Sequence, residues 1–399
     1  MSRVPKAPEH PKALCVMLVA AEASGDALGA GLMRALRRRL GEGVRFVGVG
    51  GARMAAEGLQ SPFDISDLSI LGWAEGLKAY PRVVRRADET AALAARERPD
   101  AAVLIDSWGF TLRVAQRLRR QDPKLKLIKY VGPQVWASRP KRAKTLARSV
   151  AHLLSILAFD APYFEKAGLK VTPVGNPTLA RDWSGTDPHW LRETLGAAPD
   201  DPILLVLPGS RRAEIARLMG PFGDAVARLK ASHPRLHVVL ALAESVADQA
   251  RAAAQAWPVK PFLIEGEAER IDAMRGADLA LACSGTVTTE LAMAGCPFVV
   301  AYRVSALTYV LLRIAIKTRW ITLINIAAGR EIAPELIQGR CTGRQLAGAL
   351  AARLDDEALR RRQIAEQTEA LTKLGPVGGA DPSERAADAV IAIVEGRQP

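Results

Sequence analysis

The sequence predicts an α/β protein built from two doubly wound parallel sheets. Short, almost fully apolar runs alternate with longer Ala-, Arg- and Leu-rich segments of helical period. Strands that are apolar on both faces are typical of parallel sheets covered by helices on both sides. The runs form two series, separated by a polar, Pro- and Asp-rich stretch from Pro177 to Pro202 that we interpret as a domain boundary.

The predicted strands are short apolar runs bounded by turn residues, as expected of buried strands. The first series is Leu14–Ala20, Arg45–Val49, Ala101–Ile105, Lys126–Val131 and Leu153–Leu157. The second series is Ile203–Leu207, His237–Ala241, Ala277–Ala282 and Phe298–Tyr302. Helical period predicts helices between the strands, such as Leu28–Leu40 and Pro221–Lys230, and an amphipathic helix over Ser383–Val394.

Three segments of the chain follow from this pattern. We expect an N-terminal Rossmann-like domain over residues 1–180 and a second Rossmann-like domain over 181–360. C-terminal helices over 361–399 are expected to pack back toward the N-terminal domain. Ligands of such sheets bind at the carboxyl ends of the strands, so motifs that directly follow a strand are the candidate sites.

Composition narrows the class of protein. Of the 399 residues, 49% are hydrophobic and 24% are charged, which excludes long disorder and a fibrous repeat. The formal net charge is +13, and the tract from Arg113 to Arg148 alone holds twelve basic residues and one acid, a local net charge of +11. Such an excess is typical of proteins that bind nucleic acid, an anionic membrane surface or phosphorylated ligands.

Cysteine and histidine usage predicts a cytoplasmic protein with reduced thiols and no metal site. The four cysteines form no C-x-x-C pair, and the five histidines are scattered. The apolar run Ala13–Ala21 follows three prolines and precedes an acidic turn, so we interpret it as a buried strand and not as a signal peptide. No segment offers the ~20 apolar residues that span a bilayer, so any membrane contact is peripheral.

Two motifs of the first domain follow strands. In the turn Glu22-Ala23-Ser24-Gly25-Asp26, small residues let a ligand approach the N–H groups of the next helix. The alternative is a capped helix start with Ser24 or Asp26 as the N-cap. Asp106 directly follows the apolar run Ala101–Ile105, where a carboxylate is a candidate general base; a helix N-cap is again the alternative.

One glycine-rich run of the first domain argues against a class of enzyme. The sequence G-V-G-G-A-R at Gly48–Arg53 follows a strand but lacks the last glycine of the dinucleotide fingerprint. We therefore interpret it as a tight glycine turn, and a nicotinamide or flavin enzyme is disfavoured.

Two motifs of the second domain suit a nucleotide diphosphate. In Leu207–Glu214, a Pro-Gly-Ser loop opens a helix, and Ser210 and Arg211 can bind phosphate oxygens, although the P-loop G-K-[ST] is absent. A solvated basic helix start is the alternative. Ser284, Gly285 and Thr286 form a second anion site at a helix start. Glu290, one turn further, can accept both ribose hydroxyls, or can serve only as an ordinary helix pairing residue.

A sixth stretch runs from Tyr302 to Glu331 and mixes basic residues with Trp320 and aliphatic side chains. This composition suits a surface that contacts lipid, and a buried helix followed by a loop is the alternative. Composition alone does not separate the two.

Taken in order, these motifs resemble one family, the lipid-A-disaccharide synthases, over roughly residues 14–350. The matching stretches are A-E-A-S-G-D at Ala21–Asp26, F-V-G-V-G-G at Phe46–Gly51, Y-V-G-P-Q-V-W-A at Tyr130–Ala137, L-P-G-S-R-R-A-E at Leu207–Glu214, S-G-T-V-T-T-E-L from Ser284, V-V-A-Y-R-V, and N-I-A-A-G-R-E at Asn325–Glu331. Several motifs in family order are far more specific than any single one.

The resemblance implies a GT-B fold and an inverting glycosyl transfer without metal or cofactor. The sugar of UDP-2,3-diacylglucosamine would pass to 2,3-diacylglucosamine 1-phosphate, giving the β(1→6) lipid A disaccharide and UDP. The first domain would bind the acceptor and the second the UDP-sugar. Carried over by position, the functional residues are Asp106 as base, Arg211 and Ser284–Thr286 on the diphosphate, Glu290 on the ribose, and Glu22 and Asn325 as cleft residues without an assigned role.

The sequence departs from the family pattern in three places. Gly109 stands where the family often has a second carboxylate, so Asp106 becomes the stronger candidate for the base. The motif often written S-P-S-V-W-A-W is altered at Gly132–Ser138, and Asn176 replaces a usual histidine. The last two changes leave acceptor contacts and acyl-chain preference open.

Two rival functions remain open at this point. A relative with the same fold could transfer or epimerise a UDP-N-acetylhexosamine, although the apolar stretch Leu68–Trp73 favours a substrate with acyl chains. A nucleic-acid binder would interleave its basic tract with aromatic residues, and only Tyr130 and Trp136 occur there. We therefore expect an anionic inner-membrane surface, and no nucleic acid, as the partner of the tract; a homodimer is left open.

Overall fold

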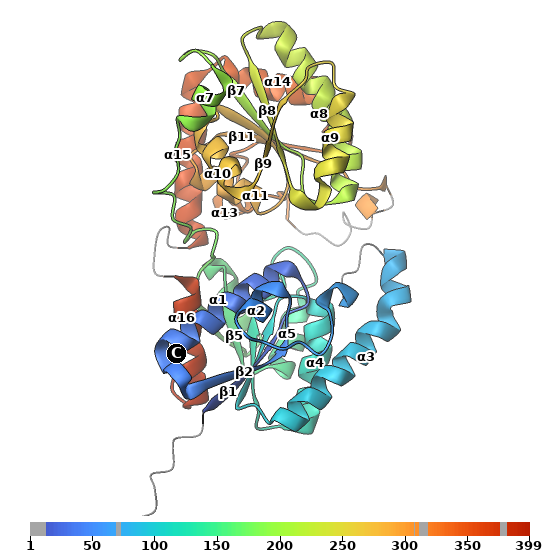
Figure 1. Ribbon diagram of the computed structural model, residues 1–399, viewed down its shortest axis with the longest axis vertical. Coiled ribbons are helices and arrows are strands. Elements are labelled where there is room, and N and C mark those ends of the chain that lie inside the picture. Colours follow the sequence, from blue (N-terminus) through green and yellow to red (C-terminus); the bar gives the residue numbers. More distant parts are fainter. Residues whose placement is uncertain (1–12, 69–72, 307, 311–317, 376–380) are drawn as a thin grey trace, which may run out of the picture. The chain divides into compact units, whose positions relative to one another are not determined.

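The computed structural model describes residues 13–68, 73–306, 308–310, 318–375 and 381–399. The chain divides into two compact units, which are described separately below (Figure 1). Unit 1 comprises residues 1–177 together with 380–399, and unit 2 comprises residues 178–379. No helix among the described residues is long and apolar enough to cross a bilayer.

Unit 1 contains a six-stranded sheet in the order β2-β1-β3-β4-β5-β6, and every pair of neighbouring strands is parallel. The strands are β1 Leu14–Val19, β2 Val44–Val49, β3 Ala101–Ile105, β4 Lys126–Tyr130, β5 His152–Ser155 and β6 Lys170–Pro173. The first five correspond to the predicted strands within one or two residues at each end.

Helices cover both faces of this sheet (Figure 1). One face packs against α1 Ala23–Leu40, α2 Ala52–Ala56 and α16 Pro382–Val394. The other packs against α3 Trp73–Glu97, α4 Trp108–Gln121, α5 Lys141–Ser149 and α6 Ala161–Glu165. Alternate residues of each strand enter the two cores: Leu104 faces α4, whereas Ile105 faces α1.

The C-terminal helix α16 belongs to unit 1. Its apolar residues Ala386, Val390 and Ile393 join the core beside α1, and its acidic residues pair with arginines of α1. Arg38 pairs with Glu384, and Arg39 Nε lies 2.8 Å from Asp388 Oδ1. The helix before it, α15 Glu357–Leu374, packs instead against helices of unit 2, so the segment 361–399 is shared between the two units.

Unit 2 contains a second six-stranded parallel sheet, in the order β12-β11-β10-β7-β8-β9. Its strands are β7 Ile203–Leu207, β8 His237–Leu242, β9 Phe262–Glu265, β10 Leu279–Cys283, β11 Phe298–Tyr302 and β12 Glu335–Ile337. One face packs against α8 Arg212–Ser232, α9 Ala247–Gln255 and α14 Gly343–Leu354. On the other side lie α7 Trp190–Leu195, α10 Glu267–Gly276, α11 Val287–Met293, α13 Leu323–Ala328 and α15 (Figure 1).

Three strands escape prediction, and each of them is an edge strand of its sheet. β6, β9 and β12 have three or four residues each, and β6 contains no fully buried side chain. An edge strand meets a neighbour on one side only, so it needs no continuous apolar run. The glycine-rich run Gly48–Arg53 also differs from its interpretation as a turn, because Gly48 lies within β2.

Gly48 is required by the close approach of two strands. Its φ is +141°, and a Cβ at this position would lie 1.8 Å from the Leu18 carbonyl oxygen of β1. We predict that Gly48→Ala lowers the free energy of unfolding by roughly 2–5 kcal/mol, measured by urea unfolding. The matched control is Gly43→Ala, where a Cβ would meet no atom within 4 Å. Equal stability of the two variants would contradict the prediction.

Candidate active site

Glu22 and Asp106 lie at the topological switch point of unit 1, which is the place in the sheet where the strand order reverses. From β1 the chain continues to β2 on one side, and from β3 it continues to β4 on the other. Loops that leave such neighbouring strands diverge and open a crevice at their carboxyl ends. Glu22 follows β1 and Asp106 follows β3, and Val19 pairs with Leu104, so both carboxylates belong to the loops of this crevice.

The turn after β1 divides its residues between surface and core. Glu22 is the N-cap residue of α1, and Glu22 and Ser24 are exposed, whereas Gly25 and Asp26 are buried. Neither Ser24 nor Asp26 caps α1. Asp26 instead accepts hydrogen bonds from the backbone N–H groups of Gly51 (2.7 Å), Arg53 (2.9 Å) and Met54 (3.1 Å). Asp26 thus fixes the start of α2, and Glu22 and Ser24 are left facing solvent.

Asp106 is half-buried and has a left-handed backbone, with φ of 47°, and so has the next residue, Ser107, with φ of 39°. Ser107, and not Asp106, is the N-cap residue of α4. Two consecutive non-glycine residues in this region store backbone strain, which structures retain mainly at functional sites. The Asp106 carbonyl oxygen accepts hydrogen bonds from Thr111 Oγ1 (2.7 Å) and from Lys129 Nζ.

Lys129 of β4 is a buried cation beside this turn, and its side chain is only 3% exposed. Its Nζ also lies 2.8 Å from Thr111 Oγ1. Burial lowers the pKa of the Lys129 ammonium to about 7, against the opposing effect of the Asp106 and Glu22 carboxylates. Sequence reasoning counted Lys129 among the surface charges of the basic tract; the apolar residues on both sides of it were the signal that was overlooked.

A cavity of about 330 Å³ adjoins this turn. Polar groups of Glu22, Ser107 and Arg113 line it together with apolar side chains such as Leu68 and Phe110. Gly109 also lines the cavity, and a Cβ at this position would meet no atom within 4 Å. The position at which the family often has a second carboxylate is therefore open space in this protein. Of the stretch Leu68–Trp73, residues 69–72 lie outside the described part of the chain.

Unit 2 repeats this arrangement, because its strand order reverses between β7 and β10. The loop after β7 is held by the buried carboxylate of Glu214. Glu214 Oε2 accepts hydrogen bonds from the backbone N–H groups of Ser210 and Arg211 (3.2 Å each), and Oε1 lies 2.8 Å from Arg211 Nη1. This contact raises the pKa of Arg211. Gly209 has φ of +114°, and a Cβ there would lie 2.3 Å from Glu214 Oε2.

The loop after β10 carries the second group of predicted residues. Thr286 is the N-cap residue of α11, and both Gly285 and Thr286 are exposed, whereas Ser284 is half-buried. The Gly285 carbonyl oxygen accepts a hydrogen bond from Thr288 Oγ1 (2.8 Å), which closes the first turn. Exposed backbone N–H groups at a helix start attract anions, and a site on this loop therefore suits a phosphate group.

Glu290 of α11 is buried and paired with cations from other elements. Its Oε2 lies 2.8 Å from Arg270 Nη1 of α10, and its Oε1 lies 3.3 Å from Arg270 Nη2 and 3.6 Å from Arg181 Nη2. The pairing is therefore across the fold and not along one helix. Arg181 Nη1 is a buried donor without a hydrogen-bond partner in the described structure. Sequence reasoning missed Arg181 and Arg270, which stand in no motif.

Asn325 of α13 is completely buried, and its side chain makes four hydrogen bonds to neighbouring protein groups. Its Oδ1 accepts hydrogen bonds from the backbone N–H groups of Ile332 (2.7 Å) and Ala333 (3.0 Å). Its Nδ2 donates to the Ala333 carbonyl (2.8 Å) and to Glu335 Oε1 (2.9 Å). Asn325 therefore holds the segment that leads into β12. Of the other predicted residues, Ser24 and Gly25 lie in the first turn of α1, Glu290 lies on α11, and the rest lie on loops after strands.

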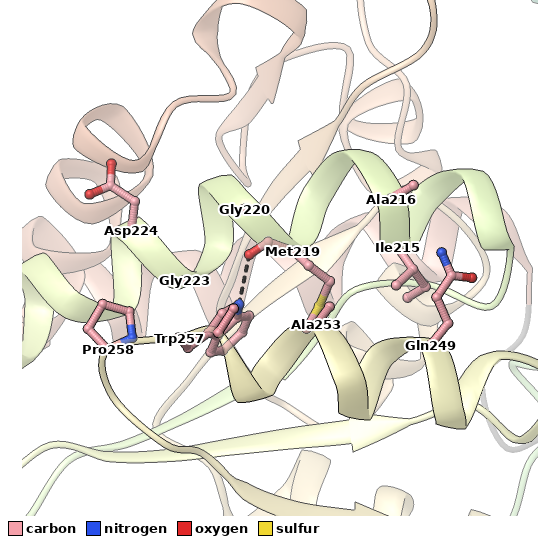
Figure 2. Close-up of a pocket in the computed structure, with 11 residues that line it drawn as sticks. Ile215, Ala216, Met219, Gly220, Gly223, Asp224, Gln249, Ala253, Trp257 and Pro258 are labelled. Carbon is pink, nitrogen blue, oxygen red and sulfur yellow. Dashed lines mark hydrogen bonds between the residues drawn. The ribbon is translucent and has the colours of Figure 1, made fainter.

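A further cavity of about 360 Å³ lies between α8 and α9, and none of the predicted site residues lines it (Figure 2). Gly220 and Gly223 of α8 line the cavity and have no side chains to fill it. The Trp257 indole packs on Gly223 and donates a hydrogen bond to the Met219 carbonyl (2.9 Å). This cavity is a gap in helix packing and not part of the candidate site.

The two sheets and their switch-point loops define the class of the protein, a two-domain GT-B fold. Solved structures with this architecture are similar over almost the whole chain. An S. aureus MnaA–UDP structure has a TM-score of 0.64 at 14% identity and covers 97% of this chain and 99% of its own. The glycosyltransferase of kitacinnamycin has a TM-score of 0.60 at 18% identity and covers 98% and 100%. These likenesses establish the fold.

Sequence comparison identifies the family. The family model for lipid-A-disaccharide synthetase matches residues 16–387. A lipid-A-disaccharide synthase from Rhodospirillum centenum is 43% identical over 386 residues, which cover 97% of this chain and 96% of that protein. The chain belongs to the lipid-A-disaccharide synthetase family, and it is a hexosyltransferase that forms the lipid A disaccharide. The resemblance inferred from the motifs is confirmed.

Removal of the Asn325 side chain tests its part in the fold. We predict that Asn325→Ala lowers the free energy of unfolding by roughly 2–4 kcal/mol, because two backbone N–H groups and one carbonyl lose buried partners. Urea unfolding measures the change. The control is Gln255→Ala, at an exposed position of α9 that should leave stability unchanged. An Asn325→Ala protein as stable as this control would show that the buried hydrogen bonds are replaceable.

Proposed function

We propose that the protein transfers 2,3-diacylglucosamine from its UDP derivative to the 6-hydroxyl of 2,3-diacylglucosamine 1-phosphate. The products are the β(1→6) lipid A disaccharide and UDP. The observation that carries the proposal is the contrast between the two switch points. In unit 1, Glu22 and Ser107, the residue after Asp106, line a partly apolar cavity, and in unit 2 Arg211 and the exposed residues Gly285 and Thr286 follow the strands.

The switch point of unit 1 suits the acceptor. An acylated sugar has a polar ring and apolar chains, and the cavity offers both kinds of surface. Asp106 acts as the base: its carboxylate removes the proton of the 6-hydroxyl while that oxygen attacks the anomeric carbon of the donor. Glu22 is the second carboxylate of this site, and Ser24 and Gly25, in the first turn of α1, are further proposed substrate contacts. Residues 1–180 would thus form the acceptor domain.

The switch point of unit 2 suits the departing UDP. As the anomeric carbon–oxygen bond breaks, its electron pair moves onto the diphosphate, and donors already in place stabilise the growing negative charge. Ser210 and Arg211 of one loop, and Ser284, Gly285 and Thr286 of the other, are the proposed diphosphate contacts. Residues 181–360 would thus form the donor domain.

Glu290 is the proposed ribose contact of the donor site. Arg270 and Arg181 hold its carboxylate, and each carboxylate oxygen has a further lone pair that can accept a ribose hydroxyl. Asn325 supports the site indirectly through the segment that it anchors.

The reaction and its base are tested together. We predict UDP and a disaccharide from the diacylated UDP-sugar and the monosaccharide phosphate, and a kcat about 10²- to 10⁴-fold lower for Asp106→Asn, because general-base catalysis contributes a factor of that size. The KM values should change little. Turnover of UDP-N-acetylglucosamine without disaccharide would favour an epimerase instead. A near-normal kcat of the Asn variant would remove Asp106 from the role of base.

We propose, further, that the basic tract docks the enzyme on the anionic cytoplasmic face of the inner membrane. The structure divides the tract's charges between internal contacts and solvent. Arg117 pairs with Asp88, Arg142 stacks on Trp108, and Lys129 is buried. The side chains left exposed are Arg120, Lys124, Lys126, Arg139, Lys141, Lys144 and Arg148. Each basic residue near an anionic bilayer contributes about 1 kcal/mol, screened by salt.

Vesicle sedimentation tests this docking. Replacement of Arg139, Lys141, Lys144 and Arg148 by glutamine should weaken binding to phosphatidylglycerol vesicles by several-fold per residue, and added salt should abolish the difference. The control replaces four exposed basic residues of unit 2, which are Lys260, Arg361, Arg362 and Lys373. The two variants carry the same net charge. Equal binding by both would show that the tract has no special part.

A further inference from the structure

Lys129 occupies a position that an apolar residue would ordinarily fill. It is the fourth residue of β4, and its side chain points toward α4, on the same face as Leu127. Its Nζ donates hydrogen bonds to the Asp106 carbonyl and to Thr111 Oγ1. The Thr111 hydroxyl in turn lies within hydrogen-bond distance of the carbonyl oxygens of Asp106 (2.7 Å) and Ser107 (2.9 Å). Lys129 and Thr111 thus converge on the strained turn.

The contacts of the fold do not explain why a cation stands here. The ladder between β3 and β4 runs through Ile105 and Tyr130, and the backbone N–H of Asp106 donates to the Tyr130 carbonyl (2.9 Å), without help from the Lys129 side chain. Burial of an ammonium opposes folding unless charge and hydrogen bonds compensate it. The groups that favour the charged form are the carboxylates of Asp106 and Glu22, which are the two acids of the proposed acceptor site.

We propose that Lys129 is a positioning residue of the glycosyl transfer, which acts through Asp106. Its hydrogen bond holds the left-handed Asp106–Ser107 turn in the form that aims the carboxylate at the acceptor hydroxyl, and its charge balances the two carboxylates of the site. The inference rests on the proposed role of Asp106 as the base. It assigns a function to a buried residue that is not among those lining the cavity.

The activity of Lys129→Met tests the positioning. Methionine keeps the length and removes the charge and the donors. We expect kcat to fall by about 10²-fold, the typical effect of a misplaced catalytic group, with the KM for both substrates unchanged because Lys129 does not contact them. Assays in detergent micelles avoid any effect of membrane docking. Lys170→Met, at an exposed position of β6, is the matched control and should keep the wild-type kcat.

Stability separates this role from a merely structural one. The pKa of Lys129 in the folded protein is about 7, below its ordinary value of 10.5, so the unfolded chain binds more protons between these values. The destabilising effect of Lys129 is therefore complete below pH 7 and fades as the pH rises toward about 10. We expect Lys129→Met to be at least as stable as the wild type in urea at neutral pH, although it is less active. Loss of both stability and activity would indicate a structural residue.

The pH profile tests the charge. The charged groups known to face Lys129 are Asp106, from the loop after β3, and Glu22, from the loop before α1. Wild-type kcat should decline as the pH rises through about 7, where the ammonium loses its proton, and Lys129→Arg should retain activity without this decline. An identical alkaline limb in both proteins would overturn the charge-balancing role.

The outcomes for the two proposals are distinct. If the wild-type protein forms no disaccharide, the proposed reaction fails and the inference about Lys129 fails with it. If the wild-type protein is active and Lys129→Met keeps its kcat, the inference alone is overturned. A fall in kcat at undiminished stability, partly restored in Lys129→Arg, supports the positioning role.

Discussion

Parallel pairing of the strands is the constraint from which the site follows. In each described sheet all strands point the same way, so every loop that leaves a carboxyl end emerges at one edge. Where the strand order reverses, two neighbouring loops diverge, and residues far apart in sequence come together. This brings the loop of Glu22 beside that of Asp106 in unit 1, and the loop of Ser210 beside that of Ser284 in unit 2.

The ionisable groups of the candidate site have charged or hydrogen-bonding partners within their own unit. Glu214 accepts hydrogen bonds from two backbone N–H groups and contacts Arg211, and Glu290 is held by two arginines. The carboxylates of Asp106 and Glu22 interact electrostatically with the ammonium group of Lys129. Such partners fix the orientation of a side chain, so less reorganisation is needed when charge moves during the reaction. The buried lysine and the left-handed turn show that this order is maintained at a cost in folding free energy.

Local sequence was sufficient for the central strands and for the loops that follow them. Alternate side chains of a run such as Ala101–Ile105 enter the cores on the two faces of the sheet. Every residue of the run must therefore be apolar, and such a run is easily recognised in the sequence. The edge strands β6, β9 and β12 are short and carry no such requirement, and they were missed, whereas the longer edge strand β2 was predicted. The partners of the site residues were also missed, because Arg181, Arg270 and Glu290 meet only in the folded chain. Lys129 was counted with the surface charges because the composition of the basic tract outweighed the apolar neighbours Ile128 and Tyr130, which mark a buried strand position.

The membership of α16 in unit 1 has a consequence for the order of folding during synthesis on the ribosome. Unit 2 is one continuous stretch, and its last strand and helices emerge before α16 does. Unit 1 begins first, yet its core beside α1 lacks Ala386, Val390 and Ile393 until α16 is released. The half that is made first is therefore completed last, and until then the apolar face that α16 covers is open to water and to chaperones.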